Sequence, residues 1–176
     1  MYVEIKTKRL LLRPLDITDL DVVHEYSSDF ETTRYLYNFP HYTIEETTQF
    51  LRKVTAEWQK ESPDFYEFAV MLGYTQIGTV SVYINKEQSE GELGWIIRSI
   101  YWGKGYAAEA AAALRDFCIN KLFLKKLVAH CDRRNSASYR VMNKIGMVLV
   151  YDDGVRVYPK TGEKAQELMC SYTRKK

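Results

Sequence analysis

The chain has 176 residues, of which 46% are apolar and 27% are charged, and its formal net charge is +2. This length and composition fit one globular domain over residues 1–176 with a single core. The nearly equal numbers of basic and acidic residues, 25 against 23, argue against a nucleic-acid-binding protein, which needs a basic surface to displace counterions.

The first half of the chain predicts one strand, two helices and then three strands. Residues 9–13, "RLLLR", are typical of a short strand that Pro14 ends. Residues 16–28 and 43–60 each begin with capping residues and place apolar side chains at helical spacing, so both predict helices. From Phe65 onward, aromatic and β-branched runs separated by turn residues predict an antiparallel meander. Its three strands are expected at 65–72, 76–84 and 91–97.

The second half predicts two helices and three strands after a glycine-containing loop. A long helix is expected over 106–123 and a shorter one over 136–146. The expected strands are 126–131, 147–151 and 165–173. The whole chain therefore predicts an α+β fold with a central mixed, mostly antiparallel sheet of six to seven strands and about four helices on its two faces.

The sequence favours a cytoplasmic protein. No segment approaches the roughly 20 apolar residues that cross a membrane, and the opening residues lack the apolar run of a signal peptide. The three cysteines, Cys118, Cys131 and Cys170, are odd in number and have no close pairs. They are typical of buried thiols in a reducing compartment.

The loop "WGKGYAAEA" at 102–110 is the first candidate binding site. A glycine-rich loop that opens a helix offers the unpaired N–H groups of the first turn to an anion. The loop is not a Walker A motif, since Lys104 is followed by Gly105, and it lacks the third glycine of a dinucleotide-binding fingerprint. Glycines before a helix also serve as tight turns, so the residues alone leave both an anion site and a turn open.

Three segments together resemble the GCN5-related N-acetyltransferase (GNAT) superfamily. "LGWIIRSIYWGKGYAAEA" is similar to its central motif, Q/R-x-x-G-x-G/A after a bulged strand, and "NSASYRVMNKIGM" resembles its second signature. The opening "TKRLLLRP" is similar to the start of the branch that includes the ribosomal-protein N-terminal acetyltransferases (RimJ/RimL-like). The resemblance runs from Thr7 to Met147 and implies a GNAT-type fold and an acetyl-coenzyme A-dependent N-acetyltransferase.

The resemblance also implies where acetyl-coenzyme A binds. In the family the loop holds the pyrophosphate on backbone amides, and the pantetheine arm lies beside the fourth strand. Asn135 would bond the pantetheine amides, although an asparagine at a helix start is often only a cap. Trp102 and Ser99 depart from the family pattern, which has glutamine or arginine and a proline there. The residues carried over are Gly103, Lys104, Gly105, Ala107 and Ala108 for the cradle, and Ile96, Ile97 and Arg98 for the pantetheine. The candidates for the 3′-phosphate are Arg133, Arg134, Arg140 and Lys144, the alternative being that these side chains are only solvated.

Acetyl transfer to an amine needs a base for the amine and an acid for the departing thiolate. Glu92, at the start of the fourth strand, is the candidate base, the alternative being an acid in open solvent. The family's usual tyrosine acid is replaced by Met142, so Ser138 is the candidate acid, the alternative being a helix-capping role. Tyr139 is adjacent but would point to another helix face. The amide of Ile97 would polarise the carbonyl.

The sequence leaves the amine acceptor open. Direct attack within a ternary complex is expected, with a protein N-terminus as the first candidate because of the ribosomal-branch resemblance. A small molecule (polyamine, amino acid or aminoglycoside) is the alternative, and a non-catalytic acetyl-coenzyme A-binding regulatory domain is a further one. The histidines His24, His41 and His130 are widely spaced, so no metal is expected. The aromatic-rich surface is compatible with a homodimer.

Overall fold

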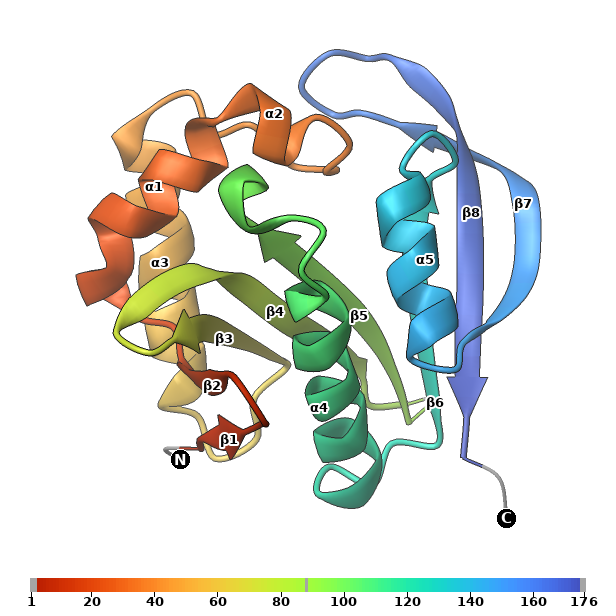
Figure 1. Ribbon diagram of the computed structural model, residues 1–176, viewed down its shortest axis with the longest axis horizontal. Helices are drawn as coiled ribbons and strands as arrows, with labels where there is room; N and C mark the ends of the chain where they lie inside the picture. Colours follow the sequence, from red (N-terminus) through yellow and green to blue (C-terminus); the bar gives the residue numbers. More distant parts are fainter. Residues whose placement is uncertain (1–2, 88, 175–176) are drawn as a thin grey trace.

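The computed structural model describes residues 3–87 and 89–174, and eight strands within them form one sheet in the order β1-β2-β3-β4-β5-β6-β8-β7 (Figure 1). The strands are β1 (Ile5–Lys6), β2 (Leu11–Pro14), β3 (Phe65–Leu72), β4 (Thr75–Asn85), β5 (Glu90–Ile97), β6 (Lys126–Asp132), β7 (Val148–Val157) and β8 (Lys164–Thr173). The helices are α1 (Leu20–Ser28), α2 (Phe30–Thr33), α3 (Ile44–Trp58), α4 (Tyr106–Asn120) and α5 (Ser136–Lys144), with short 3-10 turns at Ile17–Asp19 and Ser99–Tyr101.

The sheet opens where β5 meets β6. These two strands are parallel, whereas the other neighbouring strands are antiparallel. They pair only over Glu90–Glu92 and Lys126–Val128 and then diverge. The remaining part of β5, residues 93–97, therefore has β4 on one side and a main-chain edge without a strand on the other.

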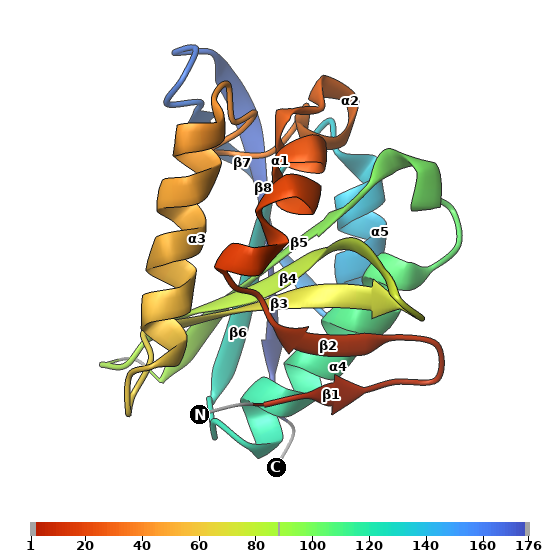
Figure 2. The ribbon, with the colours of Figure 1, turned by 90° about the vertical axis from the view of Figure 1, so that its left-hand side faces the viewer.

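Helices cover both faces of the sheet. Helices α1 and α3 lie on one face, and α4 and α5 lie on the other (Figure 2). The core runs between them through fully buried side chains such as Leu12, Leu51, Phe68 and Leu114. Each such side chain contributes about 1.5–3 kcal/mol of hydrophobic stabilisation. None of the helices in the described ranges is long and apolar enough to span a bilayer.

The predicted α+β fold with a mixed, mostly antiparallel sheet is confirmed, and two short elements are added to it. Strand β1 has two residues and α2 has four, which is too short for a hydrophobic period to develop. Helix α4 ends before the predicted residue 123, because Phe123 adopts a positive φ of 55°. The segment after residue 151 forms a hairpin, since β7 continues to Val157.

Candidate active site

The glycine loop forms the N-terminus of α4. Gly105 is the N-cap at φ 80° and Gly103 has φ 77°, a left-handed conformation that glycine adopts at little cost. The first intrahelical hydrogen bond runs from the Glu109 N–H to the Gly105 carbonyl at 3.1 Å. The N–H groups of the preceding helical residues are therefore free of intrahelical partners. A Cβ added at Gly103 would meet nothing within 4 Å, so its outer side faces open space.

The segment after β1 braces this loop. The hydroxyl of Thr7 donates to Glu109 Oε1 at 2.6 Å, and Arg9 Nε donates to Glu109 Oε2 at the same distance. Arg9 Nη1 also donates to the Lys104 carbonyl at 3.0 Å. Burial alone would raise the pKa of Glu109, but these bonds outweigh it and lower the pKa. The opening "TKRLLLRP" thus holds the loop and the first turn of α4 together.

Replacing Arg9 with alanine should weaken binding of a ligand at the loop without disturbing the chemical step. Arg9 is 41% exposed at its side chain, so the lost contacts should raise the dissociation constant of acetyl-coenzyme A by only about two- to tenfold. Titration calorimetry measures this change. Arg52→Ala, on an exposed position of α3, is the matched control and should leave the constant unchanged. An Arg9→Ala protein that binds as tightly as the wild type would contradict the bracing role.

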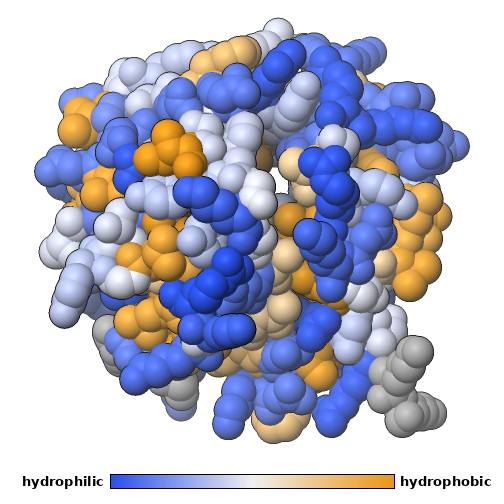
Figure 3. Space-filling model, viewed as in Figure 1, coloured by the Kyte–Doolittle hydropathy of each residue, from blue (hydrophilic) through white to orange (hydrophobic). Residues whose placement is uncertain are grey.

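A cavity of about 400 Å³, the α4–α5 cavity, lies between the end of β5, the glycine loop and α5. Figure 3 shows this face hollowed beside α5, with hydrophilic residues along the rim. Arg140 and Lys144, one helical turn apart on α5, also line it. The expected cofactor residues that line this cavity are Ile96, Ile97, Gly103, Gly105, Ala107, Ala108, Asn135 and Ser138.

Four of the expected cofactor-binding residues do not line the α4–α5 cavity: Arg98, Lys104, Arg133 and Arg134. The Arg98 N–H donates to the Ile77 carbonyl at 2.9 Å, and its guanidinium pairs with Glu25 of α1. The Lys104 ammonium lies 5.5 Å from the Tyr101 ring centroid, and the Lys104 carbonyl accepts the hydrogen bond from Arg9. Of the candidate 3′-phosphate residues, Arg133 pairs with Asp152, and Arg134 pairs with Asp132 and Glu163.

The structure shows which groups contact Asn135, Ser138, Trp102 and Met142. Asn135 caps α5, because its Oδ1 accepts from the Ser138 N–H at 3.0 Å, so a ligand would contact its Nδ2. Ser138 lies against the buried thiol of Cys131, whose pKa burial raises to about 11. The Trp102 indole donates to the Ile97 carbonyl at 2.6 Å and fastens the loop to β5. Met142 is fully buried in the core.

A second cavity, of about 900 Å³, lies on the opposite face of the sheet and is called the α1–α3 cavity. Its walls come from α1, residues 36–41, α3, strands β3 to β6, and the β7–β8 hairpin. It shares Leu36, Trp95 and Ile96 with the α4–α5 cavity. The two cavities therefore meet where β5 leaves β6.

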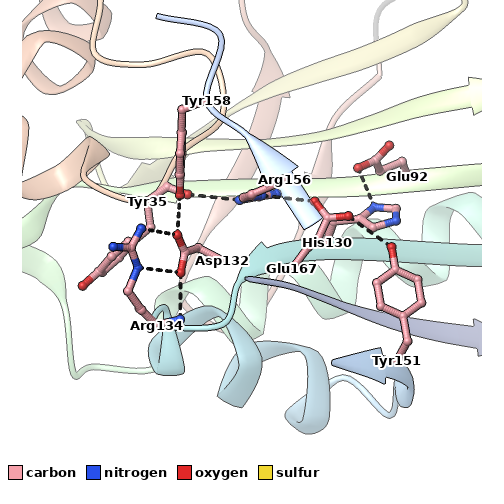
Figure 4. Close-up of polar contacts among 9 residues, drawn as sticks. All are labelled: Tyr35, Glu92, His130, Asp132, Arg134, Tyr151, Arg156, Tyr158 and Glu167. Carbon is pink, nitrogen blue, oxygen red and sulfur yellow. Dashed lines mark hydrogen bonds and ion pairs between the residues drawn. The ribbon is translucent and has the colours of Figure 1, made fainter. Parts of the chain in front are cut away.

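Glu92 lies in the α1–α3 cavity beside a histidine. Its Oε1 is 2.9 Å from His130 Nδ1 on β6 (Figure 4), and this hydrogen bond raises the pKa of His130 above its usual value. The Glu92 side chain is 54% exposed, so it reaches water as well as His130. Sequence reasoning considered His130 only as a metal ligand. In the described part of the chain, no three His, Cys, Asp or Glu side chains are grouped to hold a metal ion.

Polar contacts fix the wall behind His130. Glu167 on β8 accepts from Tyr151 and Arg156 on β7, each at 3.1 Å. At the end of β6, Asp132 accepts from the Tyr158 hydroxyl at 2.7 Å (Figure 4). The Glu167 contacts join β7 to β8, and the Asp132–Tyr158 hydrogen bond ties the hairpin to β6.

The acetyltransferase (GNAT) domain family matches residues 9–148, well over half of the chain. The chain belongs to this GNAT family. The uncharacterized N-acetyltransferase YnaD of Bacillus subtilis (strain 168) is 34% identical to this GNAT domain over 143 residues, 81% of each protein. The spermidine N(1)-acetyltransferase of Escherichia coli (strain K12) is 29% identical over 136 residues, 77% of this chain and 70% of that protein.

A solved structure of RimL, a ribosomal L7/L12 alpha-N-protein acetyltransferase, has a TM-score of 0.84 to this GNAT domain. The match covers 99% of this chain and 96% of RimL, and at 17% identity it shows a shared fold alone. Family and relatives together identify the chain as an N-acetyltransferase. The alternative of a non-catalytic regulatory domain is therefore set aside.

Proposed function

We propose that the chain binds acetyl-coenzyme A in the α4–α5 cavity and transfers its acetyl group directly to a primary amine bound in the α1–α3 cavity. The observation that carries this proposal is the meeting of the two cavities at Leu36, Trp95 and Ile96. Two reactants that enter from opposite faces of the sheet would come into contact there, so no covalent enzyme intermediate is needed. Three buried free thiols fit a reducing, cytoplasmic setting for this enzyme.

The residues of the α4–α5 cavity fit acetyl-coenzyme A. The open side of Gly103 and the first-turn N–H groups of α4 suit a pyrophosphate. Residues 93–97 of β5 have no neighbouring strand on one side among the described residues, and the Trp102 indole bonds only the Ile97 carbonyl there. This edge suits a pantetheine arm, which can add to a strand through main-chain hydrogen bonds. Arg140 and Lys144 supply positive charge on the α5 side for a 3′-phosphate. When bound, acetyl-coenzyme A supplies an activated acetyl thioester.

The chain's own groups would move the protons. Glu92 accepts the proton that the amine loses as its nitrogen bonds to the acetyl carbon, directly or through one water molecule. His130 fixes the orientation of the Glu92 carboxylate through their hydrogen bond. As the carbon–sulfur bond breaks, the Ser138 hydroxyl, which lines the α4–α5 cavity, donates a proton to the thiolate and takes one from water.

The acceptor cavity favours a cationic small amine. Three carboxylates, Glu67, Glu92 and Glu167, line it, and the likeness to a spermidine N(1)-acetyltransferase points the same way. A protein N-terminus is the second candidate, supported by the resemblance of residues 7–14 to the RimJ/RimL-like branch.

Thiol release from acetyl-coenzyme A, measured with separate pools of polyamines, N-terminal peptides and aminoglycosides, tests this function. We expect release that depends on an amine pool and is strongest with the polyamines. Strongest release with the peptides would assign a protein N-terminus instead. Absence of release from every pool, with no rise in melting temperature on adding acetyl-coenzyme A, would contradict both the activity and the cofactor site.

A further inference from the structure

Strand β3 carries one acid among apolar residues, in the sequence "FYEFAVML". Glu67 is 6% exposed and lies in the wall of the α1–α3 cavity. Its Oε1 accepts a hydrogen bond from the Tyr83 hydroxyl at 3.1 Å. In the sheet register, Glu67 lies opposite Ser81 of β4, which lies opposite Gly94 of β5. The acid therefore belongs to the cavity and not to the outer surface.

Glu67 differs from the other carboxylates of the cavity in having no cationic partner. Glu92 pairs with His130 and Glu167 pairs with Arg156, whereas no Lys, Arg or His of the described residues lies within ion-pair distance of Glu67. Burial raises the pKa of Glu67 to about 7, and hydrogen bonds from Tyr83 and Ser81 only partly offset this. A buried carboxylate without a counter-charge is costly, so the site is suited to receiving a cation.

The cations on the walls of this cavity are engaged elsewhere or neutral. The Lys53 ammonium lies 5.4 Å from the Phe65 ring centroid, and Arg156 is held by Glu167. His41 is buried, and this lowers its pKa to about 4, so its ring is neutral at pH 7. None of these side chains supplies the missing charge.

Two further polar groups of the cavity wall are also available. The Ser27 hydroxyl on α1 is buried and has no hydrogen-bond partner among the described residues, and the buried Tyr26 hydroxyl lies beside Thr79 and Gln76. Both residues line the α1–α3 cavity. Tyr26 lies close enough to Glu67 for the carboxylate to raise the pKa of its hydroxyl, although burial is the larger cause. Carboxylate and hydroxyl oxygens all accept hydrogen bonds, as the three donors of an alkylammonium group require.

We propose that Glu67 binds a second ammonium group of the acceptor, so that the acceptor is a diamine or longer polyamine. This inference rests on the proposed acetyl transfer. Glu67 lies two strands from Gly94, about 10 Å across the sheet, and Gly94 is two residues from Ile96 at the meeting point of the cavities. One amine of a flexible alkyl chain would lie at Ile96 and react, while the other ammonium contacts Glu67 with Tyr26 and Ser27 nearby.

The test compares 1,8-diaminooctane, whose chain is long enough to span this separation, with 1-aminooctane as acceptors, for the wild type and for Glu67→Gln. Glutamine keeps the shape of the side chain and removes its charge. We expect the kcat/KM of the wild type to be at least about tenfold higher for the diamine than for the monoamine. The binding free energy of a hydrogen bond to a charged group corresponds to a factor of this size. Glu67→Gln should lower the diamine kcat/KM by about 10- to 100-fold, mainly through KM, and should change the monoamine value less than twofold. Glu61→Gln removes a charge from an exposed position outside the cavity and should change neither.

A binding measurement separates this proposal from the proposed function. With coenzyme A present, 1,8-diaminooctane should raise the melting temperature of the wild type and not that of Glu67→Gln. Equal loss of diamine and monoamine activity in Glu67→Gln, or a wild type that does not distinguish the two amines, would overturn the role of Glu67 while leaving acetyl transfer intact. Loss of acetyl transfer to every amine in the wild type would instead overturn the proposed function. The wild-type comparison needs no variant, so a Glu67→Gln protein that fails to fold does not prevent a decision.

Discussion

Replacing Glu92 with glutamine should lower kcat for amine acetylation at pH 7 by about 10²- to 10³-fold, the range expected on losing a general base. The dissociation constant of acetyl-coenzyme A should not change, because Glu92 lines the α1–α3 cavity and not the α4–α5 cavity. The loss should shrink as the pH rises toward the pKa of the amine, since a free amine needs no base. Steady-state kinetics from pH 6 to pH 10, with calorimetry for the cofactor, measure both quantities.

Glu90→Gln is the matched control for this prediction. Glu90 lies two residues earlier on the same strand, but its carboxylate pairs with Lys126 and it does not line the α1–α3 cavity. We expect its kcat to stay within about threefold of the wild type, since a partly exposed ion pair contributes little to stability. If the two variants lost activity equally, a change in β5 as a whole would explain the result better than a base at Glu92.

Replacing Gly105 with valine should weaken acetyl-coenzyme A binding by about tenfold or more. A β-branched residue at φ 80° is strained by about 1–2 kcal/mol, and a Cβ there would lie 3.6 Å from Arg9 Nη2, so the branch would crowd the brace. The loop should then leave the conformation that presents the N–H groups of α4. Calorimetry gives the dissociation constant, and thermal unfolding gives the accompanying loss of stability.

Gly73→Val separates strain from ligand contact. Gly73 has φ 59° in the β3–β4 turn, and a Cβ there meets nothing within 4 Å. Its replacement should lower the melting temperature to a similar extent and leave acetyl-coenzyme A binding unchanged. If Gly73→Val weakened the binding as much as Gly105→Val, the loop would have no special part in holding the cofactor.

The sequence predicted the elements whose signals are local. The capping residue Thr43 and the apolar spacing of 43–60 anticipated α3, and the glycines at 103 and 105 anticipated the start of α4. The meander of β3, β4 and β5 followed from turn residues and β-branched runs. Each of these features is decided by residues within a few positions of one another, where propensities and caps dominate.

The sequence did not predict contacts between distant segments. Glu109 and Arg9 are 100 residues apart, and Glu92 and His130 are 38 apart, so nothing in the local pattern brings these pairs together. The divergence of β5 from β6 also depends on tertiary packing. Glu67 is an exception, because the sequence itself shows a single acid within a strand of apolar residues. Burying such an acid costs free energy unless a partner group binds it.

The short parallel seam between β5 and β6 joins two parts of the sheet, here called the two lobes, which share one hydrophobic core. Residues 3–120 carry β1 to β5, and residues 126–174 carry β6 to β8, and the sheet joins these parts through three residue pairs. A ligand that lies along the free edge of β5 and also touches α5 would contact both lobes and join them like an additional strand. Its binding energy then adds to the cohesion of the fold, by about 2.7 kcal/mol at a hundredfold excess over its dissociation constant. Coenzyme A and acetyl-coenzyme A share the groups that would make these contacts, so either of them would hold the two lobes together.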